Sequence, residues 1–139
     1  MSNVQSVGGW QLGYCRTVEH QFTKEDLQAF ADLTGDYNPL HMDHSYASTT
    51  AAGGQVVHGM LAASFISTLI GMEIPGPGAL WNDLQVSWRK IVRIGDQLRF
   101  TATVSSVNPS LDLISLDIQG EGVENGERYL DGSAKVMVI

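Results

Sequence analysis

The residues with the greatest capacity for chemistry occupy one short segment, residues 34–43, with the sequence TGDYNPLHMD. It carries a carboxylate at Asp36 and an imidazole at His41, and Pro39 between them fixes one backbone φ angle and stiffens the segment. Acid–base chemistry needs such a set relation, and a carboxylate–imidazole pair can bind one water molecule and move its proton near neutral pH. On residue types alone, a structural alternative stays open, in which Asp36 caps a turn and His41 lies on the surface.

A second group of interest is His58 and Gly59, where a long apolar helix is predicted to begin. A helix N-terminus presents free N–H groups and a partial positive charge, and a glycine there lets a bound molecule approach the backbone closely. These properties suit an oxyanion hole, in which backbone N–H groups stabilise a polarised carbonyl. The alternative is that Gly59 only eases packing of the helix and that His58 caps it.

Local signals predict the first elements that hold these residues. Residues 14–22 are expected to form a short strand, and Thr23 followed by Asp26 is a near match to the capping box that opens a helix. Gly35 is expected to end that helix, because glycine readily adopts the left-handed conformation of a C-terminal cap.

Three further segments complete the first half of the chain. Residues 36–43 are expected to form a loop, since they contain an Asn-Pro pair, and residues 44–48 a short helix. Residues 58–71, with the sequence HGMLAASFISTLIG, are apolar nearly all round, which predicts a helix buried on most sides. This helix is too short to span a bilayer.

The second half alternates apolar and polar residues with a period of two, which predicts antiparallel strands with one face on a core. The apolar positions are Leu80, Leu84, Val86 and Trp88; Leu98, Phe100, Ala102 and Val104; Ile114, Leu116 and Ile118; and Leu130, Ala134, Val136 and Val138. Trp81 and Trp88 have odd spacing, so one strand would place them on opposite faces. The economical arrangement is an α+β fold of the hot-dog type, a curved antiparallel sheet wrapped around one long apolar helix, as a single domain over residues 1–139.

Composition argues against several classes of protein. A formal net charge of −7 lacks the basic footprint of a nucleic-acid binder. No apolar run reaches the roughly 18 residues of a membrane span, and the N-terminal residues lack the basic and apolar regions of a secretory signal. One cysteine, Cys15, cannot form an internal disulfide. These observations favour a cytoplasmic protein. We also expect no metal, because nothing in the spacing of His41, His44 and His58 with Asp36 and Asp43 enforces convergence on an ion.

A specific motif joins the candidate residues. The segment TGDYNPLHMDHSYA, followed after a short gap by GGQVVHGML, resembles the hydratase-2 motif of the MaoC-like dehydratases, the (R)-specific enoyl-CoA hydratases. The match runs unbroken from Phe30 to Leu61, with Asp-x-Asn-Pro-Leu-His as its specific core. The turn at residues 94–96 is similar to one late in the family's chain, although Ile91 stands where many relatives carry a proline.

The resemblance implies a hot-dog fold and a hydro-lyase reaction, the reversible syn addition of water to a trans-2-enoyl thioester that yields an (R)-3-hydroxyacyl thioester. Asp36 and His41 would be the catalytic pair. Asn38 would orient the water or the pair, and the backbone N–H of Gly59 would bind the thioester oxygen. Which member of the pair handles which proton stays open.

The resemblance also implies a homodimer that acts on acyl-CoA, with no cofactor beyond the coenzyme A of the substrate itself. His58 is expected to contact the substrate. The cluster of Arg89, Lys90 and Arg93 is a candidate site for the phosphates of coenzyme A, and its alternative is solvated surface charge.

Three other functions stay open. The nearest is a dehydratase that acts on carrier-protein-bound acyl chains in a biosynthetic pathway, since the same pair would serve it. A hot-dog thioesterase is disfavoured by the Asp-x-Asn-Pro-Leu-His motif, because a thioesterase delivers water to the carbonyl carbon instead of C3. A catalytically silent acyl-binding subunit is disfavoured by the intact carboxylate–imidazole pair.

Overall fold

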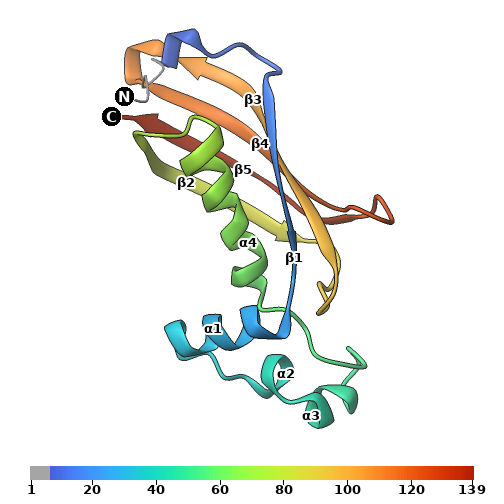
Figure 1. The fold of residues 1–139 in the computed structure, drawn as a ribbon. Helices are drawn as coiled ribbons and strands as arrows, with labels where there is room; N and C mark the ends of the chain where they lie inside the picture. The colour runs from blue at the N-terminus through green and yellow to red at the C-terminus, as the bar shows by residue number, and fades with distance from the viewer. Residues whose placement is uncertain (1–6) are drawn as a thin grey trace.

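The computed structural model describes residues 7–139 as a curved antiparallel sheet around a central helix (Figure 1). Its strands are β1 (Cys15–Gln21), β2 (Ala79–Trp88), β3 (Gln97–Asn108), β4 (Leu113–Gly122) and β5 (Arg128–Val138), in the sheet order β1-β3-β4-β5-β2. Every neighbouring pair of strands is antiparallel. The predicted α+β arrangement, with one apolar helix inside the curve of the sheet, is confirmed.

Part of the N-terminal segment on which the expectation of no secretory signal rests, residues 1–6, lies outside the described residues. From residue 7 onward, no helix is both long enough and apolar enough to cross a membrane.

The central helix α4 (Gly59–Thr68) runs on into a π-helical turn, η2 (Leu69–Glu73). Its buried side packs on the inward face of the sheet. The buried residues of α4, η2 and the inward strand positions are Leu61, Ala62, Ala63, Ile66, Leu69, Ile70, Leu98, Phe100, Ala102, Val104, Ile114, Leu116, Ile118, Leu130, Ala134 and Val136. The alternation predicted for β3, β4 and β5 is therefore confirmed.

The opposite side of α4 is open. Met60, Ser64, Ser67 and Thr68 form a stripe of exposed residues along it. The prediction of a helix buried on most sides is thus confirmed for the core-facing side, while this stripe is uncovered in the single chain. The reason is the sheet order, since β1 and β2 lie at opposite edges and do not join to close the sheet around the helix.

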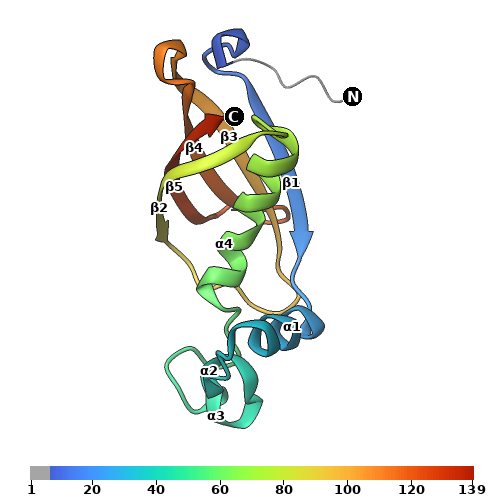
Figure 2. The same cartoon turned by 90° about the vertical axis from the view of Figure 1, so that its left-hand side faces the viewer.

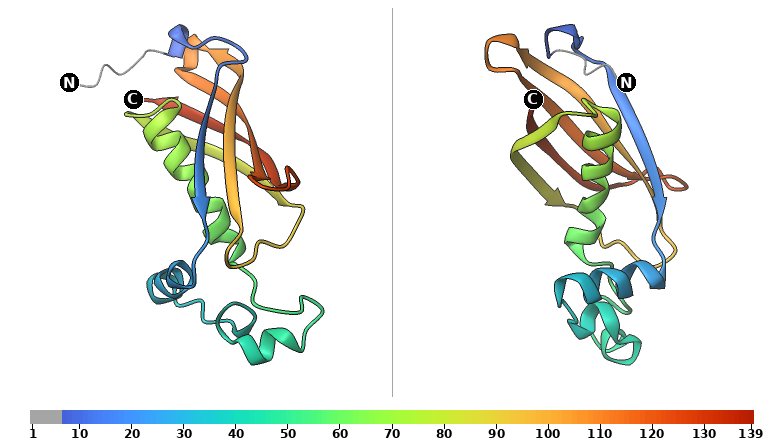
Figure 3. Two further views of the ribbon diagram at one scale, coloured as in Figure 1. Left: turned by 45° about the vertical axis from the view of Figure 1, so that its right-hand side comes forward. Right: turned by 60° about the vertical axis from the view of Figure 1, so that its left-hand side comes forward.

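Three short helices gather at one end of the sheet, beside the N-terminus of α4 (Figures 2 and 3). They are α1 (Lys24–Thr34), α2 (Pro39–Met42) and α3 (His44–Ser48). The predicted capping box opens α1: the Thr23 hydroxyl accepts the Asp26 N–H at 3.1 Å, and the Asp26 carboxylate accepts the Thr23 N–H at 2.9 Å. Gly35 ends the helix with φ 80°, as predicted. The expectation of a loop throughout residues 36–43 is wrong at α2, because Asn38 caps this turn and Pro39 suits its first position.

Strand β2 departs from its predicted pattern at a β-bulge, where the register with β5 shifts between Trp81 and Asp83. The extra residue reverses the alternation, so Trp81 packs toward the core and lines a cavity against α4, whereas Leu80 is 50% exposed. Beyond the bulge, the indole of Trp88 reaches the first residue of α4. The expectation that Trp81 and Trp88 lie on opposite faces is wrong for this reason, since both face α4.

Candidate active site

Three side chains meet where the short helices join α4. Asp36 comes from the loop after α1, His41 from α2, and His58 from the N-cap of α4. One oxygen or nitrogen atom of each lies within 4.8 Å of such an atom of both others. Two groups that hydrogen-bond the same water molecule at about 2.8 Å are separated by about 4.5 Å. The spacing therefore allows these side chains to share one water molecule.

His41 is held with one ring nitrogen free. Its Nδ1 lies 2.7 Å from the carbonyl oxygen of Val56. A carbonyl only accepts, so Nδ1 carries the hydrogen and Nε2 of the neutral ring presents a lone pair. The backbone is tied to the same segment, because Gln55 Nε2 donates to the His41 carbonyl at 2.7 Å. His41 is half-buried rather than a free surface residue, and its Nε2 is set to accept a proton.

The Asp36 carboxylate is exposed, and it also shapes its own loop. One oxygen accepts the backbone N–H of Asn38 at 3.2 Å, which is the turn-capping contact that the structural alternative predicted. No side-chain or backbone donor among residues 7–139 reaches its other oxygen, Oδ2. Asn38 in turn caps α2 by accepting the Leu40 N–H at 3.0 Å. Asn38 therefore holds the loop that carries Asp36, while its orientation of a water molecule stays a prediction.

His58 lies behind the pair and is 1% exposed. Its ring stacks on that of His41, with centroids 4.2 Å apart, and packs against Phe30. Nε2 donates to the backbone carbonyl of Asp36 at 3.1 Å, and Nδ1 has no hydrogen-bond partner in the described part of the chain. Burial lowers the pKa of His58 below its usual value, so the ring is neutral at physiological pH.

His58 is the N-cap residue of α4 by position, as the sequence alternative had it, but its side chain makes no capping hydrogen bond to the helix. The ring instead connects the backbone of Asp36 to the face of His41, a contact between distant segments that no local pattern predicts. His58 also lines a cavity of the site, and its contact with the substrate stays a prediction.

Gly59 stands between two cavities. As the first residue of α4, its N–H donates no hydrogen bond within residues 7–139. A cavity of about 310 Å³ reaches His41, and a cavity of about 620 Å³ reaches Asp36. Gly59 and Trp88 line both cavities. A ligand that extends from one cavity into the other therefore passes this free N–H, which also carries the positive end of the helix dipole.

Donor atoms of the same three side chains, Asp36, His41 and His58, lie close enough together to bind one metal ion. The two imidazole rings, however, are poorly oriented for such a site. A metal ion lies close to the plane of each imidazole that binds it, at about 2.1 Å from the nitrogen. The rings of His41 and His58 are stacked, with their planes inclined by 30°. The expectation that the protein uses no metal stays a prediction.

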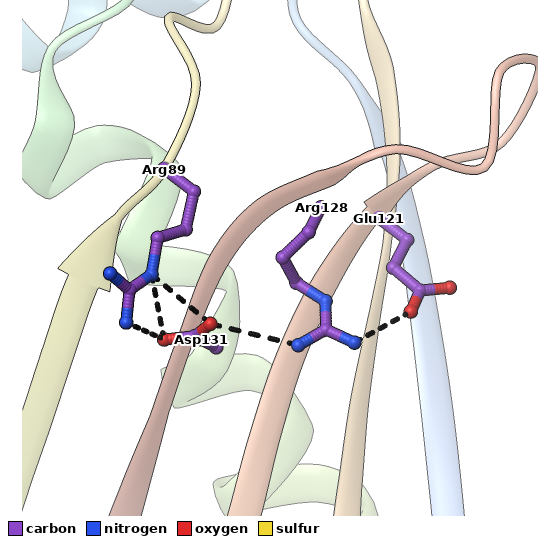
Figure 4. A network of polar contacts seen from close by, with 4 residues as sticks. All are labelled: Arg89, Glu121, Arg128 and Asp131. Atoms are coloured by element: carbon purple, nitrogen blue, oxygen red, sulfur yellow. Dashed lines mark hydrogen bonds and ion pairs between the residues drawn. The ribbon is translucent and has the colours of Figure 1, made fainter.

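The predicted cationic cluster is divided among partners. The Asp131 carboxylate forms ion pairs with the guanidinium of Arg89 at 3.1 Å and with that of Arg128 at 3.6 Å. Arg128 also pairs with Glu121, which extends the network (Figure 4). Lys90 pairs with Glu127, and Arg93 donates to the backbone carbonyl of Ala52. Arg89 and Lys90 line the smaller cavity, and Arg93 is not among its lining residues. A phosphate of coenzyme A at this cavity would have to displace the carboxylate that now pairs with Arg89 or Lys90. The phosphate-binding role of these residues stays a prediction.

Known proteins share this fold and sequence pattern. The family model of the MaoC-like domain matches residues 13–120 of this chain. An (R)-specific enoyl-CoA hydratase of Rhodospirillum rubrum is 33% identical over 126 residues, which are 91% of this chain and 86% of that protein. The solved structure of an (R)-hydratase from A. caviae, involved in PHA biosynthesis, is 30% identical with a TM-score of 0.89, and the match covers 94% of this chain and 98% of that one. A mitochondrial 3-hydroxyacyl-[acyl-carrier-protein] dehydratase of Arabidopsis thaliana is 35% identical over 77 residues, 55% of this chain and 45% of that protein.

The curved sheet around one helix is the hot-dog fold, and the protein is an enzyme of the hydro-lyase class. The chain belongs to the MaoC-like family. The family resemblance inferred from residues 30–61 is therefore confirmed, and the relatives do not support the thioesterase and silent-subunit alternatives. The roles of the individual site residues stay predictions.

Proposed function

We propose that the protein catalyses the reversible addition of water to a trans-2-enoyl-CoA, giving an (R)-3-hydroxyacyl-CoA. The observation that carries this proposal is the approach of Asp36 and His41 within 4.8 Å, at cavities that both adjoin the unpaired N–H of Gly59. Hydration of a conjugated thioester needs a group that handles the protons of water and a donor that stabilises the carbonyl oxygen. The site offers both.

In this mechanism the Gly59 N–H binds the thioester oxygen, which makes C3 electrophilic and stabilises the enolate that forms. A water molecule held by Asp36 and His41 loses one proton to the pair while its oxygen bonds to C3. The pair then returns a proton to C2, so one O–H bond and the π bond between C2 and C3 break while one C–O and one C–H bond form, without a net change in charge. The two groups act as a coupled pair in these transfers.

The acyl donor in this proposal is coenzyme A. The R. rubrum relative named for enoyl-CoA matches over most of both chains, whereas the carrier-protein dehydratase of A. thaliana matches over about half of each. Arg89 and Lys90 beside the smaller cavity are the candidate partners of its phosphates, in place of their present carboxylate partners. The carrier-protein reaction is the second candidate, favoured by the identity to the A. thaliana protein.

Self-association as a homodimer forms part of the proposal. The exposed stripe on α4 and the open edge of β2 lie on the same side of the single chain, next to the cavities of the site. A second copy would cover both.

The proposal is tested by hydration of crotonyl-CoA in deuterated water. One water molecule held on one side of the double bond delivers oxygen and deuteron to the same face. The hydrogen bond from the Gly59 N–H to the thioester oxygen fixes which face this is. We expect a 3-hydroxybutyryl-CoA of (R) configuration at C3, with deuterium at C2 placed by syn addition. The measurement is the configuration of both carbons by NMR and chiral chromatography.

A parallel assay with crotonyl-carrier protein serves as the matched control for the donor. We expect kcat/KM to be higher with the coenzyme A thioester, and the reverse order would establish the carrier-protein reaction. An (S) product would overturn the proposal that the Gly59 N–H holds the thioester carbonyl. Anti addition would overturn the single-water mechanism even in an active enzyme.

A further inference from the structure

Trp88 occupies the point where the two cavities of the site meet, and the mechanism above does not use it. It is the last residue of the edge strand β2 and is 46% exposed. Its indole N–H donates to the backbone carbonyl of Gly59 at 2.9 Å. Since Trp88 and Gly59 line both cavities, the strand sends this ring to the residue that carries the proposed oxyanion donor.

The contact between these two residues is steric as well as polar. A Cβ atom built at Gly59 would lie 3.3 Å from Nε1 and 3.4 Å from Cε2 of Trp88, which is tighter than most such contacts. The indole therefore lies against the α-carbon of Gly59, and a side chain at this position would have to displace the ring by a few tenths of an ångström. Glycine is the residue type with the greatest backbone freedom, so neighbouring contacts have the largest influence on its orientation.

That freedom matters because an oxyanion donor is effective only when it is aimed before the charge develops. Trp88 holds the carbonyl of Gly59 and covers one side of its α-carbon, and it leaves the N–H unpaired. We propose that Trp88 is the positioning residue that aims the Gly59 N–H at the thioester oxygen of the substrate. This inference rests on the proposed function, in which that N–H binds the thioester.

A purely structural role makes different predictions from a positioning role. If Trp88 only fastened β2 to α4, its loss would lower thermal stability and leave the folded enzyme with its normal turnover. A positioning residue acts on the transition state, where the oxygen carries the most charge, so its loss lowers kcat more than it raises KM.

The first test is Trp88→Phe, which keeps an aromatic face against Gly59 and removes the N–H donor. We expect kcat for crotonyl-CoA to fall about 3- to 10-fold, as for the loss of one neutral hydrogen bond, with KM changed less than about 2-fold. Trp88→Leu removes the face as well and lowers kcat further. The matched control is Trp10→Phe, at the other end of the sheet, where the Trp10 ring packs against Tyr14 with the two ring planes inclined by 52°. This variant should keep wild-type kcat.

The second test measures, without turnover, how strongly the Gly59 N–H hydrogen-bonds the carbonyl of a bound ligand. In an Asp36→Asn background, a bound 2,4-dienoyl-CoA shows a shift of its ultraviolet band to longer wavelength when its carbonyl accepts a hydrogen bond. We expect this shift in Asp36→Asn and a smaller shift in the Asp36→Asn/Trp88→Phe double variant, measured by difference spectroscopy at saturating ligand. Circular dichroism confirms that each variant is folded.

The outcomes separate the two proposals. A wild-type protein without hydratase activity overturns the proposed function, and the dienoyl spectrum then still reports whether Trp88 affects the bound carbonyl. Equal kcat and an equal spectral shift with and without the indole N–H overturn the positioning role, and so does the absence of any shift in Asp36→Asn.

Discussion

At the scale of single residues, backbone carbonyls decide how the rings of the site present themselves. Each carbonyl takes one ring N–H and so fixes the orientation of that ring: Val56 receives His41 Nδ1, Asp36 receives His58 Nε2, and Gly59 receives Trp88 Nε1. For His41 the consequence is chemical, because the remaining nitrogen of the neutral ring is an acceptor. The site is therefore preorganised by main chain rather than by a network of charged side chains.

The catalytic pair gives the most direct prediction at this scale. We expect Asp36→Asn and His41→Ala each to lower kcat for crotonyl-CoA hydration by about 10²- to 10⁴-fold, because each removes a group that handles a proton in the reaction. The fold should be retained, since Asp36 is exposed and His41 half-buried. Steady-state kinetics with the circular dichroism spectrum of each variant checks both statements.

The matched control for the pair is Asp32→Asn. Asp32 is an exposed carboxylate near the end of α1, whose side chain accepts from Tyr37 and Gln28 and does not line either cavity. This variant should keep wild-type turnover. A folded Asp36→Asn or His41→Ala enzyme with the turnover of this control would remove the acid–base roles from the pair.

The sequence was sufficient to predict Asp36, His41 and Gly59 as candidates, because their types and spacing lie within one motif and at one helix start. It also named His58, but it did not predict which groups His58 and Trp88 contact. Their contacts join segments that are distant in the chain, and only the fold brings the N-cap of α4 against the loop of Asp36 and the end of β2 against Gly59. Such contacts leave no periodic pattern.

At the scale of elements, hydrophobic periodicity predicted the strands well and the face of individual residues less well. The period of two placed the inward residues of β3, β4 and β5 correctly, because these strands pair regularly along their apolar positions. In β2 the bulge after Trp81 exchanged the faces of the residues before it. A bulge depends on pairing with a neighbouring strand, so the sequence of β2 alone does not reveal it.

Close packing of β2 on β5 gives the prediction for this scale. A Cβ atom at Gly132 of β5 would lie 1.8 Å from the carbonyl oxygen of Gln85 in β2, and a backbone atom cannot move aside as a flexible side chain can. We expect Gly132→Ala to lower the free energy of unfolding by about 2–3 kcal/mol, because the two strands must separate locally. Urea unfolding at a fixed protein concentration measures this change.

Gly8→Ala is the matched control for this substitution. The nearest atoms to a Cβ there belong to Pro109 at 4.0 Å, an ordinary contact distance. This variant should unfold within about 0.5 kcal/mol of the wild type, as is usual away from tight contacts. If Gly132→Ala were equally mild, β2 would have to be free to move away from β5, and its end at Trp88 would be a poor support for Gly59.

At the scale of the whole molecule, the main surface that the single chain leaves uncovered is the open side of α4 beside β2. The exposed stripe on α4 lies beside the edge strand β2, and the cavity between them is lined by Met60, Ala63, Ser64, Ser67, Trp81 and Leu84. An exposed edge strand and a partly apolar helix face are surfaces that soluble proteins usually cover. This side also adjoins the larger cavity of the site, through Met60 and Ser64. Self-association there would affect both stability and substrate access.

The last prediction follows from this open side. We expect the protein to be a homodimer at micromolar concentration, with a mass by light scattering of twice 15.1 kDa. Stable interfaces bury about 1,200–2,000 Å² in total, and the α4 stripe with β2 is the continuous surface on which a second copy can do so. Ser67→Arg places a long charged side chain on this stripe, where a single chain exposes it to water and a partner would bury it. This variant should therefore sediment as a folded monomer, whereas Leu33→Arg, at an 85% exposed position on α1, should remain dimeric. A wild-type protein that is monomeric and fully active would show that the site is complete in one chain, and a dimer unaffected by Ser67→Arg would move the interface to another face.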